Sequence, residues 1–330
     1  MTDELRISPW LADRLACPHD HLPLRRTAAT MQCANGHVHR IISGIPVLFR
    51  DDVEETHWHV TQARQASDVG YPSASTNGIN DYVHAAIAAT GGFLYKPLIG
   101  RLTEYPIPAT RLPPGNARPL LDLGCNWGRW TIAAARAGYR AVGIDPSLPA
   151  VQAAYDVTRQ LGIEADFVVG DARFLPFMDG VFDTVSSYSV LQHFSKNDVR
   201  QTLAECARVL APDGRLLIQM ANKLGLRSLF HQARRRFREP SLFEVRYWTP
   251  SELAATFTQL VGPSVLSVDG FFSLNAQPQE AHLLPARLRA IVTISEWLRR
   301  LSHRIPALQA VADSLYVESR KPAADRTPKA

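Results

Sequence analysis

The chain has few of the features that mark secreted, membrane or fibrous proteins. Its 330 residues include only four cysteines, too few for a disulfide framework in a chain of this size, so a reducing compartment is expected. No apolar run approaches the roughly 18 residues of a membrane span. Residues 1–4 carry neither a basic nor an apolar leader pattern, and the chain contains no internal repeat. We therefore expect a cytoplasmic protein without a transmembrane segment.

The composition that remains is that of a globular protein, with 46% hydrophobic and 20% charged residues. The net charge is +5, and basic residues cluster at 234–238 and 299–304. Such clusters suit a phosphate group, a nucleic acid or a membrane surface, and they suit a solvated helix face as well. The sequence leaves these readings open, and it does not indicate an oligomeric state.

From residue 118 onward, short apolar runs alternate with segments of helical periodicity. This alternation predicts an α/β fold, specifically a Rossmann-like, seven-stranded, mostly parallel sheet with helices on both faces. The expected strands are 120–123, 141–144, 166–169, 184–187, 215–220, 264–268 and 314–319, and the expected helices include 130–136, 148–161, 197–209 and 249–260.

The rest of the chain divides by composition into smaller parts. Residues 1–50 read as a small ribbon-like module of short β-strands and turns. Residues 51–115 read as helices over 53–66 and 79–102 and a proline-rich linker. Within the main domain, 116–322, we expect a lid over 222–248 and a helical insertion over 275–312, and residues 323–330 read as a tail.

Acidic residues lie at or just after the ends of the first three expected strands. Asp122 precedes a loop with two glycines, whose spacing is poor for a dinucleotide pyrophosphate. It suits a ligand with an amine or a sulfonium, because Asp122 can act on the positive charge. Asp145 follows the second strand and can accept hydrogen bonds from ribose hydroxyls. Asp171, with Ala172, follows the third strand and can accept the amino group of adenine.

In this order, and followed by 182–194 and 208–218, these stretches resemble the class I S-adenosylmethionine-dependent methyltransferases. The resemblance covers about residues 118–321 and implies S-adenosylmethionine as the cofactor. It implies cofactor contacts from Asp122, Gly124, Cys125, Asn126, Trp127, Gly128, Asp145, Pro146, Asp171, Ala172 and Ser187.

One position departs from the pattern of that family. Asn126 stands where the family has a second glycine, and asparagine tolerates the positive φ that the loop requires better than most residues do. The bulky Trp127 can wall the methionine end of the pocket, or it can pack with Trp130 against neighbouring helices.

The acceptor is expected at the ends of the fourth and fifth strands. His193 is the candidate general base, because imidazole titrates near neutrality, and Tyr188 is a second catalytic candidate. The alternative for His193 is a packing role. Candidate acceptor contacts, whose aromatic members could instead hold the lid against the core, are Gln192, Arg246, Tyr247 and Trp248.

The N-terminal module resembles the zinc ribbons that accompany some RNA and protein methyltransferases. The matching residues are Cys17, Cys33 and His37, with Asp20 in place of a second cysteine. They can form a structural zinc site, with Asp20, His19 or His21 as the fourth ligand. A ribbon that has lost its metal and is held by its own core is the alternative.

Three functions are compatible with the sequence. The leading hypothesis is an S-adenosylmethionine-dependent methyltransferase that moves the methyl group to a small-molecule or biosynthetic-intermediate acceptor by in-line displacement. The second is an rRNA or tRNA methyltransferase that docks RNA through the ribbon. The third, a non-catalytic cofactor-binding scaffold, is disfavoured by the acids at Asp122, Asp145 and Asp171. The sequence does not indicate which atom is methylated.

Overall fold

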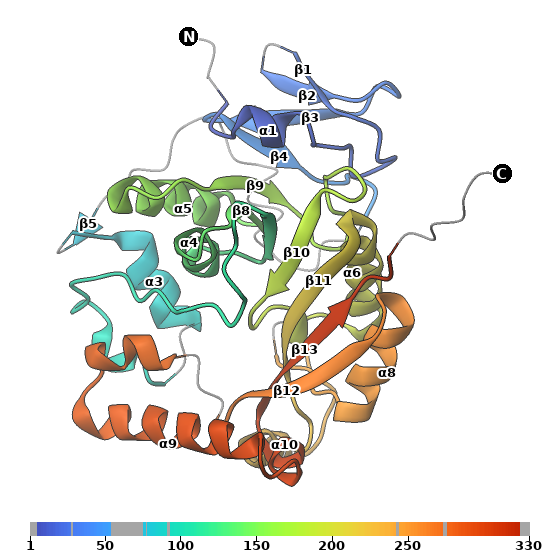
Figure 1. Ribbon diagram of the computed structural model, residues 1–330. Coiled ribbons are helices and arrows are strands. Elements are labelled where there is room, and N and C mark those ends of the chain that lie inside the picture. The colour runs from blue at the N-terminus through green and yellow to red at the C-terminus, as the bar shows by residue number, and fades with distance from the viewer. Residues whose placement is uncertain are drawn as a thin grey trace.

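A computed structural model describes residues 5–27, 29–53, 75–76, 78–90, 93–241, 244–272 and 276–323. A twisted sheet of eleven strands forms its centre (Figure 1), in the order β1-β2-β3-β4-β9-β8-β7-β10-β11-β13-β12. These strands are β1 Arg25–Thr27, β2 Thr30–Gln32, β3 Val38–Ile42, β4 Ile45–Leu48, β7 Pro119–Leu123, β8 Arg140–Asp145, β9 Asp166–Gly170, β10 Phe182–Ser187, β11 Leu210–Ala221, β12 Ser264–Gly270 and β13 Ser314–Arg320.

Helices pack on both faces of the sheet, as the sequence predicts. A small two-stranded sheet, β5 Ser75–Thr76 and β6 Ile79–Asn80, lies apart from it. The helices are α1 Pro9–Ala12, α3 Asp81–Thr90, η1 Lys96–Leu98, α4 Arg129–Arg136, α5 Leu148–Leu161, η2 Leu191–His193, α6 Lys196–Val209, α7 Leu226–Arg234, α8 Pro250–Leu260, η3 Pro278–Leu283, α9 Ala286–Ser302 and α10 Ala307–Val311.

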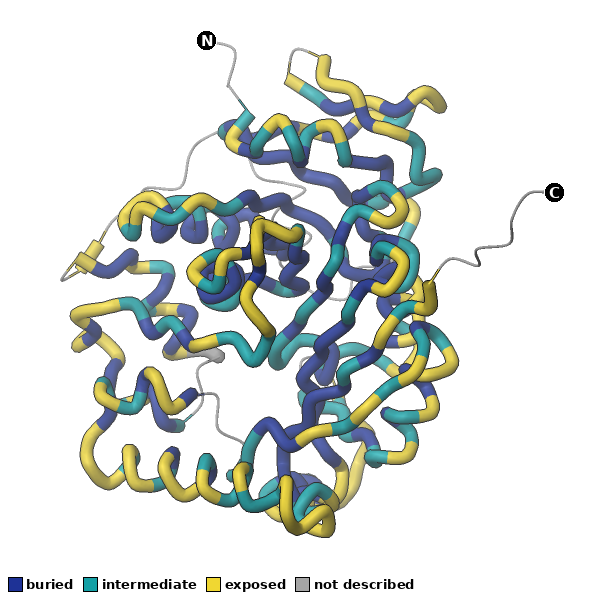
Figure 2. The backbone as a smooth tube through the Cα atoms, viewed as in Figure 1, coloured by how far each residue is buried: buried dark blue, intermediate teal, exposed yellow. Residues whose placement is uncertain are grey.

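The central strands are buried on both faces, as Figure 2 shows. Successive side chains of a strand point to opposite faces. Leu121 accordingly joins the core that contains Leu203 of α6 and Phe257 of α8, whereas Leu120 joins a cluster with Ala134 of α4. This alternation fixes which helix covers which face. The start of α8 carries the expected capping box, formed by Thr249 and Glu252.

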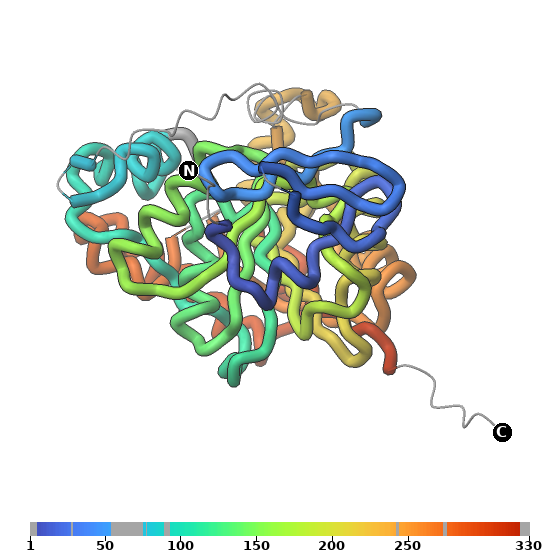
Figure 3. Tube along the Cα trace, turned by 90° about the horizontal axis from the view of Figure 1, so that it is seen from above, coloured from blue at the N-terminus to red at the C-terminus, as the bar shows by residue number. Residues whose placement is uncertain are grey.

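The prediction of a seven-stranded sheet is wrong in its count. The seven expected strands are present, but four N-terminal strands extend the same sheet, because β4 pairs in parallel with β9 through Val47↔Val169 and Leu48↔Gly170. Seen from above, the blue N-terminal strands lie over the green strands (Figure 3). Without this pairing, β9 would be an edge strand with free backbone groups. Residues 1–50 are therefore joined to the main domain by main-chain hydrogen bonds.

The helical parts of the chain differ in extent from the prediction. The predicted helix over 53–66 lies, apart from residue 53, outside the described residues, and the one over 79–102 is limited to α3 and the short η1. The expected lid contains α7, and the expected insertion contains η3, α9 and α10. Within the described ranges, no helix is long and apolar enough to cross a membrane.

Candidate functional site

The pairing of the parallel strands brings the predicted cofactor residues to one edge of the sheet. Leu123 at the end of β7 lies beside Ile144 of β8 and beside Ser187 of β10. Asp145 at the end of β8 lies beside Val169 of β9. Since the strands run in one direction, their carboxyl ends form a common rim, which is where open α/β sheets bind ligands.

The loop 124–128 is shaped by three residues with positive φ. Gly124 has φ +69° and Gly128 has φ +85°, and a Cβ at Gly124 would lie 2.5 Å from Val190 Cγ2. Asn126 also has a positive φ, +48°, and its side-chain oxygen accepts a hydrogen bond from the Trp127 N–H at 2.8 Å. Asn126 thus adopts the positive φ that was expected at this position of the loop.

Two buried carboxylates face this loop. Asp122 accepts a hydrogen bond from the Thr131 hydroxyl at 2.7 Å, and Asp145 accepts the N–H groups of Asn126 and Ser147, both at 2.9 Å. Burial raises the pKa of Asp122 to about 7 and that of Asp145 to about 6. A positively charged ligand would relieve this cost, because it favours the ionised carboxylates.

The third predicted acid, Asp171, is already engaged by an arginine. Its carboxylate accepts hydrogen bonds from Arg173, including one from Nη2 at 2.8 Å, and Arg173 also contacts Asp198 at 3.2 Å. The backbone N–H, Nε and Nη2 of Arg173 all donate to this carboxylate, so most of its roughly four lone-pair sites are already occupied. Arg173, which fixes the orientation of Asp171, is not among the predicted site residues.

The two tryptophans near the loop have different environments. Trp127 is 4% exposed and packs in an apolar cluster with residues of the helical segment, Val83 of α3 among them. Trp130 stacks on Tyr188 with ring centroids 4.4 Å apart. Trp130 and Tyr188 line a small cavity that also borders Asp122, Ser187, Arg111, Leu217 and Tyr316. Of the two, Trp130 is therefore the one that lines a cavity beside Asp122.

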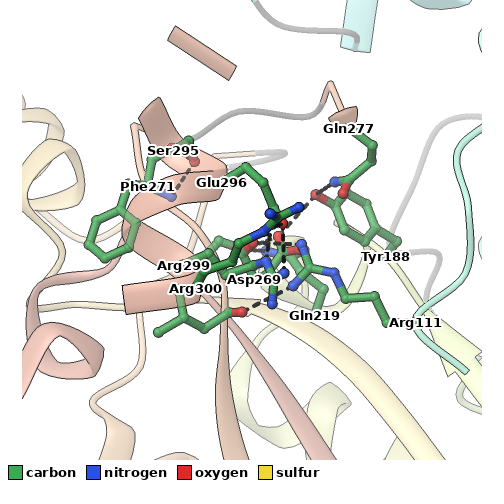
Figure 4. A network of polar contacts seen from close by, with 12 residues as sticks. Arg111, Tyr188, Gln219, Asp269, Phe271, Gln277, Ser295, Glu296, Arg299 and Arg300 are labelled. Atoms are coloured by element: carbon green, nitrogen blue, oxygen red, sulfur yellow. Dashed lines mark hydrogen bonds and ion pairs between the residues drawn. The ribbon is translucent and has the colours of Figure 1, made fainter. Parts of the chain in front are cut away.

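A buried polar network begins where this cavity ends (Figure 4). Asp269, at the end of β12, is 4% exposed. Its carboxylate accepts hydrogen bonds from the Tyr188 hydroxyl at 3.0 Å and from the Ser314 hydroxyl at 2.7 Å. Arg111 lies 3.2 Å from the other carboxylate oxygen, and the Gln277 amide donates to the Tyr188 oxygen at 2.9 Å. The network therefore joins β10, β12, the linker and the helical insertion.

Asp269 was missed by the sequence analysis, although a signal for it exists. It directly follows the apolar end of an expected strand, as Asp145 does. The strand itself was predicted, over 264–268, but its neighbour in the sheet was unknown. Only the pairing of β12 with β13, Val268↔Leu315, places this acid at the rim where the other strands end.

Tyr188 is a buried phenol whose hydroxyl already has a partner, and a catalytic role for it stays a prediction. Burial raises the pKa of the phenol well above its ordinary value, and the hydroxyl already donates to Asp269. A raised pKa disfavours the phenolate form that a general base requires. Tyr188 forms an aromatic wall of the cavity and presents an oriented hydroxyl.

The predicted lid residues are gathered near η2 by main-chain contacts. The Arg246 N–H donates to the carbonyl of Gln192 at 2.7 Å, and its guanidinium donates to the carbonyl of His193 at 2.6 Å. Tyr247 lies under the guanidinium of Arg235. Trp248 is 1% exposed within the main core, which favours the alternative role in packing; its contact with the acceptor stays a prediction. A catalytic role for His193 stays a prediction.

The N-terminal module brings its four predicted metal ligands together. The sulfur, nitrogen and oxygen atoms of Cys17, Asp20, Cys33 and His37 all lie within 4.8 Å of one another. His37 Nδ1 is 3.5 Å from Cys17 Sγ, 3.3 Å from Cys33 Sγ and 3.2 Å from the Asp20 carboxylate. Tetrahedral zinc sets such ligand atoms about 3.3–3.8 Å apart, so the donor set and its spacing fit zinc.

The surroundings of this cluster favour Asp20 among the candidates for the fourth position. Burial raises the pKa of Asp20, but hydrogen bonds from the Leu22 N–H and from Asn35 outweigh it and hold the pKa at about 2. Asp20 is therefore ionised near neutral pH, as a carboxylate ligand would have to be. His19 stacks on His37 and faces Asp51 instead. Sequence reasoning missed His39, whose Nε2 lies 3.4 Å from Cys17 Sγ and can support that ligand from behind.

The same module reaches the predicted adenine side of the rim. The chain leaves β4 at Leu48, directly beside Gly170 of β9. The guanidinium of Arg50 then lies 4.7 Å from the centre of the Phe174 ring, and Phe174 follows Asp171 and Arg173. The N-terminal strands are thus a neighbour of the site as well as an extension of the sheet.

Comparison with known proteins identifies the region that carries this rim. Residues 120–214 match the family model described as "Methyltransferase domain". The chain is 33% identical over 142 residues to the uncharacterized methyltransferase YcgJ of Bacillus subtilis, covering 42% of this chain and 54% of that protein. It is 30% identical over 115 residues to a ubiquinone biosynthesis O-methyltransferase of Rhizobium etli, covering 33% of this chain and 46% of that protein.

A third relative and one solved structure complete this comparison. Norajmaline N-methyltransferase of Rauvolfia serpentina is 32% identical, with 32% of this chain and 37% of that protein covered. The crystal structure of YcgJ from Bacillus subtilis has a TM-score of 0.44 at 23% identity, covering 65% of this chain and 95% of that chain. The chain spans about half the length, or less, of the curated relatives it matches.

Proposed function

We propose that this methyltransferase-family domain binds S-adenosylmethionine at the rim and transfers its methyl group to a small-molecule or biosynthetic-intermediate acceptor. The observation that carries the proposal is the pair of buried carboxylates, Asp122 and Asp145, with raised pKa values beside a loop of positive φ. Without a ligand, the burial of two acids beside this loop only costs stability. A ligand with a positive charge and a ribose gives both of them partners.

Each residue at the rim has a task in this proposal. Asp122 faces the positive charge of the methionine end, and the glycines of the loop allow close approach of the backbone. Asp145 accepts from the ribose hydroxyls, and Asp171, held by Arg173, accepts from adenine. When bound, S-adenosylmethionine supplies a methyl group on a sulfonium that is already a good leaving group. The protein then needs to align the acceptor and exclude water.

The aromatic side chains beside Asp122 favour a small acceptor, which would have to displace some of them, because the cavity between them is only about the size of a water molecule. Trp130, Tyr188 and Tyr316 enclose it, and Gln277 of the insertion closes the network at its end. A side chain such as the Tyr188 hydroxyl, fixed by Asp269, can orient an acceptor that carries a hydroxyl or an amine. Two of the relatives are named for methyl transfer in ubiquinone biosynthesis and to norajmaline, both of which concern small molecules.

Calorimetry tests the cofactor part of the proposal. We expect S-adenosylmethionine to bind, and Asp145→Asn to weaken binding about tenfold to hundredfold, because a charge-assisted hydrogen bond contributes about 1.5–3 kcal/mol. Asp156→Asn on the neighbouring helix α5, where Asp156 pairs with the exposed Arg159, is the matched control. No binding to the wild type, or equal binding by both variants, would contradict the proposal.

The acceptor class is tested by transfer of a labelled methyl group into fractionated cell extract. The proposal expects the label in the small-molecule fraction. Label in RNA would establish the alternative, an RNA methyltransferase. Cofactor binding without transfer to any fraction would leave the scaffold function.

We also propose that Cys17, Asp20, Cys33 and His37 hold a structural zinc ion. The spacing of the four ligand atoms and the support of Cys17 by His39 favour this. The ion would fix the N-terminal strands, and through β4 it would steady the end of β9. It would take no part in methyl transfer.

A further inference from the structure

The segment 223–238, which we call the basic segment, exposes an unusual amount of apolar surface. Eleven large hydrophobic residues are exposed in the described part of the chain, and five of them lie within these sixteen positions. Leu226 and Phe230 are each 61% exposed, and Phe237 is 66% exposed. Single exposed apolar residues are ordinary, whereas a concentration of them marks an interaction surface. The five are Leu224, Leu226, Leu229, Phe230 and Phe237.

Helix α7, inside this segment, has its polar face inward. Ser228 and Gln232 are 1% and 4% exposed, and the Gln232 amide donates to the carbonyls of Lys223 and Ser228. Leu226, Leu229 and Phe230 share the outer face at helical spacing. A helix that serves only the core would bury its apolar face instead. The outward orientation of these side chains therefore needs an apolar partner from outside.

The helix is held firmly in this orientation. Asp313, at the start of β13, accepts the N–H groups of Arg227 and Ser228 at 2.7 and 2.9 Å. A Cβ at Gly225 would lie 2.5 Å from the Cα of Asp313, so the turn into α7 is closely packed. The exposure of Phe230 is therefore a property of the folded protein, and it does not come from a loosely attached helix.

The charge of the basic segment indicates which kind of partner would bind it. It contains six cationic residues, Lys223, Arg227, Arg234, Arg235, Arg236 and Arg238, and no acidic residue. Lys223, Arg234 and Arg236 are exposed, and none of the three has an ion pair among the described residues. Apolar side chains flanked by cations are the composition of helices that lie in the interface of anionic bilayers.

We propose that the basic segment docks the protein on a bilayer surface that contains anionic phospholipid. Leu226, Leu229 and Phe230 enter the headgroup region, and the exposed Arg234 and Arg236 meet the lipid phosphates, whereas Arg238 already pairs with Glu244. The segment directly follows β11, whose carboxyl end belongs to the rim of the cofactor loop, and it lies at the periphery in the view from above (Figure 3). Docking does not depend on methyl transfer. The idea that docking presents the rim to lipid-soluble acceptors does rest on the proposed function.

Cosedimentation with vesicles tests the docking. We expect the full chain to bind vesicles of equimolar phosphatidylglycerol and phosphatidylcholine, not phosphatidylcholine alone, and to dissociate as salt is raised. Phe230→Ser should weaken binding about tenfold or more, since one buried phenylalanine contributes that much. Arg236→Gln should weaken it about fivefold. Val265→Ser, which removes a 70% exposed valine on β12 outside the segment, should leave it unchanged.

Three outcomes would overturn the proposal. One is the absence of binding to anionic vesicles at low salt by a folded wild-type chain. Another is equal loss of binding in Phe230→Ser and Val265→Ser, with both variants melting as the wild type does. The third is a dimer in solution that Phe230→Ser dissociates, without vesicle binding, because the partner would then be a second copy of the chain. Since none of these measurements uses S-adenosylmethionine, they are distinguishable from failure of the proposed reaction.

Discussion

At the scale of single residues, the site contains buried acids whose desolvation costs stability unless a ligand compensates for it. Asp122 and Asp145 are buried at 2% and 9% exposure, and their hydrogen bonds come from Thr131 and from two backbone N–H groups. These bonds do not offset the desolvation, so both pKa values are raised. The free energy stored in this way becomes available when a cation binds.

These pKa values predict a pH dependence. A carboxyl whose pKa is higher in the folded state binds more protons when folded, so its stability contribution is full at low pH and disappears as pH rises through about 6 to 7. A cationic ligand prefers the ionised acids. We therefore expect binding of S-adenosylmethionine to tighten from about pH 5.5 to about pH 7.5, with release of protons. Calorimetry in two buffers of different ionisation enthalpy measures that release; proton uptake would contradict the assignment.

At the scale of elements, the N-terminal strands and the central sheet form one unit. The pairing of β4 with β9 makes the small module an edge of the main sheet. Its predicted zinc ligands lie on the turns that order these strands: Cys17 and Asp20 precede β1, and Cys33 and His37 lie between β2 and β3. Metal binding in such a small unit is coupled to its folding.

Removal of one predicted ligand should expose this coupling. We expect about one zinc per chain, and Cys33→Ser should lose the metal and lower the unfolding free energy by at least about 1–3 kcal/mol, because buried polar ligands are left without partners. Elemental analysis and thermal unfolding measure both effects. His21→Ala, a change on the same turn outside the proposed ligand set, is the control and should retain zinc. A metal-free wild type would refute the site.

At the scale of the whole molecule, a buried ion pair ties the cofactor loop to distant parts of the chain. Arg129, the first residue of α4, donates to both carboxylate oxygens of Glu280 in η3, and Nη2 lies 2.7 Å from Oε1. The Tyr95 hydroxyl donates to the same carboxylate at 3.0 Å. The segment that contains Tyr95, the loop that precedes α4 and the helical insertion therefore contact one another at this ion pair.

Breaking this pair should cost more than a surface pair does. Glu280→Gln leaves the Arg129 guanidinium buried without its counter-charge, and we expect unfolding to become easier by about 3–5 kcal/mol. Arg159→Gln removes an ion pair whose arginine is 73% exposed and should have little effect. Denaturant unfolding of both variants makes the comparison. A similar small change in the two would show that the buried pair does not hold the parts together.

Local pattern alone predicted a large share of the fold and of the site. The strands that flank the loop, the acids at their ends and the positive φ of Asn126 follow from residues that are near one another in the chain. Hydrophobic period and turn chemistry act over a few residues, so they can be read from the sequence. The four metal-ligand candidates were also found in this way, from two short motifs.

Contacts between distant segments determined the parts of the fold and of the site that local pattern did not predict. The sequence by itself determined that an α/β sheet would end in acids suited to an adenosine ligand. Only tertiary structure decided that β4 would extend this sheet, that Trp248 would enter the core, and that Asp269 would hold Tyr188 from 81 positions away. Strand pairing and side-chain burial depend on contacts between residues that are far apart in the chain. The local sequence around a residue does not specify those contacts.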